Sequence, residues 1–178
     1  MTESSGRASQ THASLNIRQA EAPAEIAQAR KLFTEYAESL GFSLCFQGFD
    51  EELANLPGEY APPAGRLLLA YAAEPTPNTT ANAQGPAGCV ALHALEAGIC
   101  EMKRLYVRPD FRGKGVGKEL IDAILTAARA IGYTRMRLDT IEPIMKDAVR
   151  MYRALGFREI EPYRANPIAG ALYMELQL

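Results

Sequence analysis

Between Leu105 and Leu120 the chain reads Leu-Tyr-Val-Arg-Pro-Asp-Phe-Arg-Gly-Lys-Gly-Val-Gly-Lys-Glu-Leu. Its apolar start predicts a strand, Pro109-Asp110 predicts a turn, and the glycines lead directly into a helical pattern. Glycines let the backbone approach a ligand closely, and the first N–H groups of a helix have no partner within it. Together with the helix dipole and the charges of Arg112, Lys114 and Lys118, the stretch predicts a site for a phosphate or diphosphate.

Glycine clusters of this kind also occur in proteins of different classes. A tight turn without a ligand would need the same residue type. A P-loop needs Lys-Ser or Lys-Thr after its last glycine, whereas Gly117 is followed by Lys118-Glu119, so magnesium–nucleotide chemistry is disfavoured. A dinucleotide-binding unit places Gly-x-Gly-x-x-Gly early in a βαβ unit. Here the glycines alternate with single residues and follow three strand-like segments, which disfavours a dinucleotide site.

The composition is that of an ordinary globular protein. Of the 178 residues, 48% are hydrophobic and 22% are charged, and the formal net charge is −2. This balance argues against a nucleic-acid partner, although residues 103–118 are locally positive. No apolar run is long enough to span a bilayer, so we expect no membrane association. We expect a flexible leader at residues 1–14, followed by a single domain over residues 15–178.

The cysteines and histidines do not form a metal-binding pattern. Cys45, Cys89 and Cys100 are widely spaced, and His12 and His93 are far apart in the sequence. The odd number of cysteines favours a reducing compartment, and we expect a cytoplasmic location. Cys89 and Cys100 lie in apolar runs and are predicted to be buried. The sequence therefore predicts no metal site.

Hydrophobic periodicity predicts alternating groups of strands and helices. We expect strands at 15–18, 66–73, 87–95, 100–107, 134–140, 157–161 and 171–178, and helices at 23–40, 50–56, 116–131 and 146–155. Residues 74–86 are rich in Pro, Thr and Asn, which predicts a mobile connection between two strands. This order of elements predicts a mixed α/β sheet.

Two segments resemble the GNAT acetyltransferases. The residues from Arg112 to Gly117 are similar to the family's Arg/Gln-x-x-Gly-x-Gly/Ala signature, and those from Ala148 to Phe157 are similar to its Ala-x-x-Leu-Tyr-x-x-Leu-Gly-Phe segment. The stretch from Glu101 to Val107 is similar to a bacterial-type subgroup of mostly unassigned substrate. The resemblance covers roughly Ile17 to the C-terminus. It implies an α/β (α+β) mixed sheet of about seven strands, splayed between strands 4 and 5 and flanked by about four helices.

The resemblance also implies acetyl-CoA as co-substrate, with no metal. Its pantetheine arm is expected between the splayed strands, and the backbone N–H of Leu105 is expected to polarise the thioester carbonyl. The residues expected to bind the cofactor are Leu105, Tyr106, Val107, Arg112, Gly113, Lys114, Gly115, Val116, Gly117 and Lys118.

The implied reaction is direct attack of a neutral amine on the acetyl thioester, which needs a base for the amine and an acid for the leaving sulfur. Tyr152 matches the family's proton-donating tyrosine; a core aromatic is the alternative. Glu101 is the first candidate for the base, although a salt bridge with Lys103 or Arg104 would explain it equally well. Asp139 and Glu142 are further candidates for the base.

The residues that bind the acceptor amine are those that the sequence defines least. The residues expected to line it are Tyr36, Phe42, Phe46, Tyr163 and Asn166, and the loop 163–170 is expected to close over the site. Many relatives carry an asparagine where this chain has Met145, so cofactor contacts there stay open. The resemblance leaves the acceptor amine unnamed and is compatible with a homodimer. The alternative function is a non-catalytic acyl-CoA-binding sensor or scaffold, against which Tyr152 argues.

Overall fold

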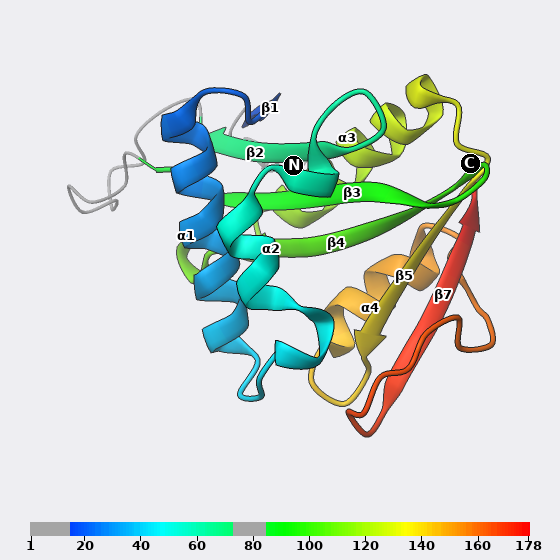
Figure 1. Ribbon diagram of the computed structural model, residues 1–178. Helices are drawn as coiled ribbons and strands as arrows, with labels where there is room; N and C mark the ends of the chain where they lie inside the picture. Colours follow the sequence, from blue (N-terminus) through cyan, green and yellow to red (C-terminus); the bar gives the residue numbers. More distant parts are fainter. Residues whose placement is uncertain (1–14, 73–84) are drawn as a thin grey trace, which may run out of the picture.

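A computed structural model describes residues 15–72 and 85–178 of the chain (Figure 1). The predicted leader at residues 1–14 and most of the predicted strand connection at 74–86 lie outside the described residues. That residues 15–178 form one domain stays a prediction. No helix in the described ranges is long and apolar enough to cross a membrane.

The centre of the fold is a seven-stranded sheet with the order β1-β2-β3-β4-β5-β7-β6. The strands are β1 (Leu15–Gln19), β2 (Arg66–Ala72), β3 (Gly88–Glu96), β4 (Ile99–Val107), β5 (Arg135–Ile141), β6 (Arg158–Glu159) and β7 (Ala171–Gln177). The pair β4–β5 is parallel, and the other neighbouring pairs are antiparallel. The predicted mixed sheet is therefore confirmed.

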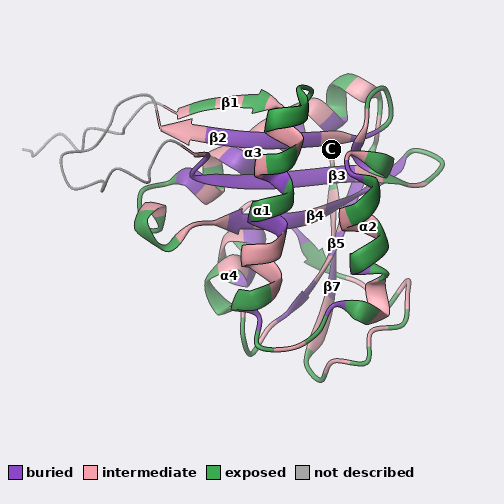
Figure 2. Ribbon diagram, turned by 60° about the vertical axis from the view of Figure 1, so that its left-hand side comes forward, coloured by how far each residue is buried: buried purple, intermediate pink, exposed green. Residues whose placement is uncertain are grey.

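Helices cover both faces of the sheet. The helices α1 (Pro23–Ser39) and α2 (Phe49–Asn55) cover one face, and α3 (Val116–Ile131) and α4 (Lys146–Ala154) cover the other. In α3 the buried side chains recur every three or four positions, because only one stripe of the helix meets the sheet; they are Val116, Leu120, Ile121, Ile124, Leu125 and Ala128. Figure 2 shows buried central strands beneath a helix α1 whose outer side is exposed.

Strands β4 and β5 pair only at one end. Their register runs from Ile99–Arg135 to Glu101–Arg137 and stops there. Beyond that point the two strands diverge, as Figure 1 shows. Strand β4 also carries a bulge against β3 between the Cys89 and Ala91 positions, where Arg104 adopts a positive φ of 57°. The predicted splay is therefore present, and it opens the sheet next to the glycine loop.

Most predicted elements agree with the structure to within one or two residues. The last hairpin differs: the sequence predicts a strand at 157–161, but β6 contains only Arg158 and Glu159. Both are exposed, and Pro162, which has no N–H to donate, follows shortly afterwards. In α4 the buried residues are Val149 and Tyr152. The insertion of β7 between β5 and β6 has no signal in the sequence.

Candidate active site

The glycine loop forms the N-terminus of α3 as a cradle of free amides. Gly113 and Gly115 adopt φ values of 71° and 85°, in the left-handed region that favours glycine, and Gly115 is the N-cap of α3. The amides of Phe111 and Arg112 bond to the carbonyls of Arg108 and Pro109. From Gly113 to Lys118 the amides have no hydrogen-bond partner among the described residues. A helix of 16 residues therefore presents its positive end and a run of donors to one side.

These amides face a groove of about 680 Å³, here called the α3 groove. It lies between the end of β4, the glycine loop and the first turns of α4. The structure brings most of the predicted cofactor residues together there, namely Leu105, Tyr106, Val107, Arg112, Gly113, Gly115, Val116, Gly117 and Lys118. Lys114 does not line it; its Nζ lies 5.7 Å from the centroid of the Phe111 ring.

The opposite wall of the α3 groove comes from α4, whose cations are absent from the predicted cofactor residues. Lys146 and Arg150 line it together with Ala148 and Met151. A signal is present in the sequence, because positions 146 and 150 are four apart and share one face of a helix. The groove therefore has cationic side chains on both walls, which suits a polyphosphate ligand.

Two of the predicted phosphate-binding side chains have protein partners. The Nε of Arg112 donates to the carbonyl of Val107 over 2.9 Å, and its guanidinium lies 5.8 Å from the Tyr106 ring. The Nζ of Lys118 lies 2.5 Å from Asp122, in an exposed i,i+4 pair. Because these contacts are exposed or use only one nitrogen, both side chains keep donors for an anion in the α3 groove.

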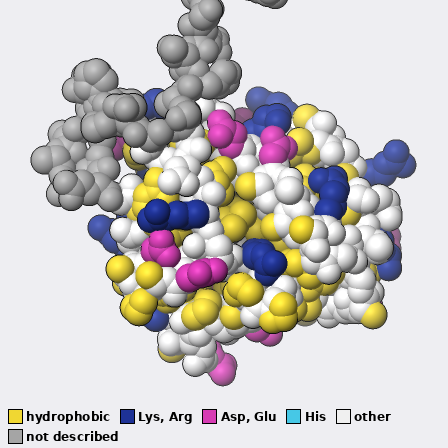
Figure 3. All heavy atoms as spheres, turned by 90° about the horizontal axis from the view of Figure 1, so that it is seen from above, with side chains coloured by type: hydrophobic (Ala, Val, Ile, Leu, Met, Phe, Trp, Pro, Cys, Tyr) yellow, Lys and Arg dark blue, Asp and Glu magenta, His cyan; other side chains and the backbone are white. Residues whose placement is uncertain are grey.

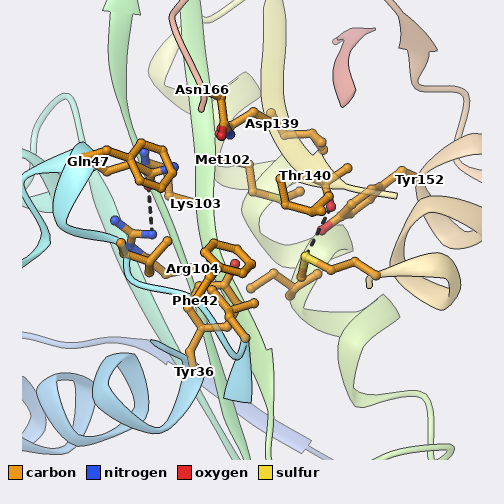
Figure 4. Close-up of a pocket in the computed structure, with 17 residues that line it drawn as sticks. Tyr36, Phe42, Gln47, Met102, Lys103, Arg104, Asp139, Thr140, Tyr152 and Asn166 are labelled. Atoms are coloured by element: carbon orange, nitrogen blue, oxygen red, sulfur yellow. Dashed lines mark hydrogen bonds between the residues drawn. The ribbon is translucent and has the colours of Figure 1, made fainter. Parts of the chain in front are cut away.

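A second, much smaller space lies beside the α3 groove. This narrow cavity measures about 50 Å³ and shares Tyr36, Leu40, Leu105 and Met145 with the groove. Four predicted residues line it, namely Tyr36, Phe42, Phe46 and Asn166. Figure 4 shows its polar side chains arriving from different elements, with Lys103 and Gln47 on one side and Thr140 and Tyr152 on the other.

Tyr152 reaches the narrow cavity from the buried face of α4. Its side chain is buried and packs against the Phe157 ring, with the centroids 5.7 Å apart. Within the described part of the chain, its hydroxyl has no hydrogen-bond partner. Burial and then the neighbouring Tyr36 raise the pKa of Tyr152, so it keeps its proton at neutral pH. Burial likewise raises the pKa of Tyr36 to about 12. The cavity thus contains two neutral phenols.

Glu101 does not line this cavity or the α3 groove. It lies in the paired part of β4, between His93 of β3 and Arg137 of β5, and its side chain is fully buried. His93 Nε2 lies 2.8 Å from one carboxylate oxygen, and the Tyr163 hydroxyl donates to the other over 2.7 Å. The Arg164 guanidinium forms an ion pair with the same carboxylate. This environment differs from the open position expected of a base.

Tyr163 also lies away from the predicted acceptor wall. Besides binding Glu101, it packs edge-on against Tyr173, with the ring centroids 5.3 Å apart. Its neighbour Arg164 lines a separate space of about 410 Å³ between α2, β3 and β4, here called the side cavity. Of the candidate base residues, Glu142 is paired with Arg153 on the surface. The roles predicted for these residues stay predictions.

Asp139 is the carboxylate that lines the narrow cavity. It lies near the end of β5, where the strands have already diverged, and it is only partly buried. One oxygen accepts from Asn166 Nδ2 over 3.1 Å. The other has no partner among the residues that the structure describes. A carboxylate with a free oxygen in a cavity can accept a proton or bind an ammonium group.

Met145 stands where many relatives have an asparagine, and it lines both the α3 groove and the narrow cavity. It is the residue before α4, and its sulfur lies 3.3 Å from the Thr140 hydroxyl. A thioether accepts hydrogen bonds only weakly and donates none. This part of the wall is therefore apolar.

One face of the molecule shows no large surface of a single charge. On the face shown in Figure 3, Lys and Arg side chains are scattered among apolar and acidic ones. This distribution agrees with the net charge of −2.

Comparison with known proteins assigns the family. Residues 31–157 match the model of the acetyltransferase (GNAT) family. An uncharacterized N-acetyltransferase of Schizosaccharomyces pombe is 39% identical over 166 residues, which cover 92% of this chain and 95% of that protein. The chain belongs to the GNAT acetyltransferase family.

Solved structures show the same fold. A GNAT acetyltransferase of Staphylococcus aureus superposes with a TM-score of 0.71 at 18% identity, covering 92% of this chain and 99% of that one. A structure described as an acetyltransferase from Salmonella typhimurium with its cofactor acetyl-CoA superposes with a TM-score of 0.61 at 17% identity, covering 92% and 93%. The predicted fold and family are confirmed.

Proposed function

We propose that this protein transfers the acetyl group of acetyl-CoA to a primary amine of a small molecule or peptide. The observation that carries the proposal is the junction between the two spaces. A cradle of amides opens onto the α3 groove, and the groove shares a wall with the cavity that Tyr152 lines; neither the amides nor the phenol has a hydrogen-bond partner among the described residues. A diphosphate held by the cradle would direct the rest of the ligand along β4 towards Tyr152.

The residues present fit acetyl-CoA. The amides from Gly113 to Lys118 can bind a diphosphate without losing an existing bond, and a Cβ added at Gly113 would meet nothing within 4 Å. Arg112, Lys118, Lys146 and Arg150 supply positive charge around it. The unpaired stretch of β4 beyond Glu101 can bond to an extended ligand as a further strand would. The Salmonella structure with acetyl-CoA supports the same choice.

Bound acetyl-CoA supplies an activated thioester: a carbon–nitrogen bond forms, the carbon–sulfur bond breaks, the nitrogen loses one proton and the sulfur gains one. The Tyr152 hydroxyl is proposed to donate the proton, since it is neutral, has no other partner among the described residues and faces the cavity. Tyr36, Leu105 and Met145 line both the groove and the cavity, so they surround the point where the reacting groups would meet.

For the base we propose Asp139 in place of Glu101. Asp139 lines the narrow cavity with one free oxygen, whereas the Glu101 carboxylate is buried and bound on both oxygens. Extracting a proton with Glu101 would require breaking its contacts with His93, Tyr163 and Arg164.

The test is turnover by the purified protein. Acetyl-CoA is mixed with a panel of amino acids, polyamines, aminoglycosides and peptides, and free thiol is recorded while mass spectrometry identifies acetylated product. We expect acetyl-CoA binding and product from at least one class. Binding of acetyl-CoA without product from any amine would favour the sensor alternative, and lack of binding would refute the proposal altogether.

A further inference from the structure

Lys103 is a nearly buried cation that has no hydrogen-bond partner among the residues that the structure describes. It lies in β4 opposite Ala91 of β3, and its side chain is only 9% exposed. Among the described residues, its closest carboxylate oxygen is Oε2 of Glu101, 3.8 Å away. That distance is beyond hydrogen-bond range.

Two of the acidic groups near Lys103, those of Glu101 and Glu52, already have other partners. The Glu101 carboxylate is hydrogen-bonded to His93 and Tyr163 and forms an ion pair with Arg164. The Glu52 carboxylate accepts hydrogen bonds from Arg104 Nε over 2.9 Å and Nη2 over 2.5 Å. It also accepts one from the Tyr60 hydroxyl over 2.7 Å. These pairs engage Arg164 and Arg104, so the nearest carboxylate to Lys103, that of Glu101 at 3.8 Å, is one that Lys103 shares with Arg164 and His93.

Lys103 lies where its charge can contact a ligand in either of two cavities. Lys103 and Gln47 line both the narrow cavity and the side cavity, so they stand where the two spaces meet. Asp139 lines the narrow cavity together with Lys103, but the two do not form an ion pair. Figure 4 shows Asp139 and Asn166 on a different side of the cavity from Gln47 and Lys103. The acceptor region is therefore bipolar.

We propose that the acceptor amine carries a carboxylate, as an amino acid does, and that Lys103 binds this carboxylate while Asp139 faces the amine. This inference rests on the proposed acetyl transfer and specifies its substrate class. The narrow cavity, at about 50 Å³, takes only the reacting end of the acceptor. The side cavity, at about 410 Å³, takes the rest.

The remaining charges around the side cavity agree with this orientation. Arg164, which pairs with Glu101, lines it as a second cation. Of the carboxylates that line it, Glu52 pairs with Arg104, Glu59 has a side chain that is 80% exposed, and Glu51 is exposed as well. Water screens such exposed carboxylates, so they repel a buried anion only weakly. Burial, followed by the charge of Arg104, lowers the pKa of Lys103 to about 8, so the ammonium form still predominates at neutral pH. A polyamine would place a second positive charge against Lys103 and is disfavoured.

The first experiment compares matched acceptors. Each amino acid is assayed beside its methyl ester and its decarboxylated amine, with thiol release as the readout. We expect the free acid to have the higher kcat/KM, and Lys103→Met to raise its KM roughly 10- to 100-fold, the range for a charge-assisted hydrogen bond. Lys31→Met, which removes an exposed lysine of α1, is the matched control and should change nothing. Esters or decarboxylated amines that react as well as the acids would overturn the inference and leave acetyl transfer intact.

The second experiment does not need turnover. N-acetyl amino acids are titrated calorimetrically into the CoA-loaded protein at pH 8.5. Wild type should bind members of this panel, and Lys103→Met should bind them at least 10-fold more weakly. Because a bound carboxylate holds the proton on Lys103, binding to wild type should also take up protons, seen as a heat that depends on the buffer. Equal binding by the variant, or no binding to wild type, would refute the inference.

The variant must be folded for either result to count. Circular dichroism melting and the affinity for acetyl-CoA provide this check, since Lys103 does not line the α3 groove. Should Lys103→Met fail to fold, Lys103→Gln keeps a polar side chain of similar length and serves in both experiments.

Discussion

Replacing Tyr152 by Phe tests the chemical step most directly. Removing the hydroxyl leaves the contact with Phe157 in place and breaks no hydrogen bond of the described structure. We therefore expect the free energy of unfolding to change by less than about 1 kcal/mol. A general acid contributes about 100-fold or more to a rate, so kcat should fall by at least about 100-fold, or about 3 kcal/mol of transition-state stabilisation.

The assay is thiol release at saturating acetyl-CoA across the pH range, with calorimetry for acetyl-CoA affinity. The affinity should stay within about twofold, because the hydroxyl acts on the leaving sulfur rather than on the diphosphate. Tyr133→Phe is the matched control: it removes a hydroxyl that donates to the Ala64 carbonyl over 2.8 Å, away from both spaces. Full turnover by the Tyr152 variant at every pH would show that the phenol is not the acid.

Three further predictions concern the cradle, the base and the buried lysine. Gly115→Val should weaken acetyl-CoA binding at least about 10-fold by calorimetry, whereas Gly132→Val, with the same left-handed strain at the other end of α3, should not. Asp139→Asn should lower kcat/KM about 100-fold with little change in melting temperature. Glu101→Gln should mainly lower the melting temperature, and the reverse pattern would restore Glu101 as the base. The pKa of Lys103 falls on folding from 10.5 to about 8, so the unfolded state holds an extra proton between these values. Urea denaturation should therefore show that the unfolding free energy of wild type, measured relative to that of Lys103→Met, rises by about 3 kcal/mol from pH 8 to 10.5.

The framework of the fold is predictable because its signals are local. The apolar stripe of α3 and the alternation in β7 each lie within a single element, and glycines mark helix ends such as Gly132, whose φ is 105°. The short β6 and the insertion of β7 beside β5 are not predictable. They depend on which strand pairs with the free edge of β5, and this is a property of the assembled sheet.

The donor half of the candidate site is likewise predictable from local sequence, whereas the acceptor half depends on the assembled fold. The groove for the donor is formed largely by one continuous stretch, from Leu105 to Lys118, whose backbone conformation its own glycines determine. The acceptor half is assembled from Tyr36, Gln47, Lys103, Asp139 and Asn166, which come from α1, the segment before α2, β4, β5 and the loop before β7.

No sequence spacing links those acceptor-side positions. Which of their charges pair with one another is therefore known only from the folded structure. This is why Glu101, a carboxylate on the right strand, resembles a base until its buried partners are visible. Side chains two residues apart on a strand share one face, so Lys103 should lie beside Glu101. The sequence therefore allows Lys103 to be the counter-ion of Glu101. Only the tertiary structure adds Arg164 as a second cation at Glu101, and Lys103 then stays 3.8 Å from the carboxylate, beyond hydrogen-bond range, with its donors available to a ligand.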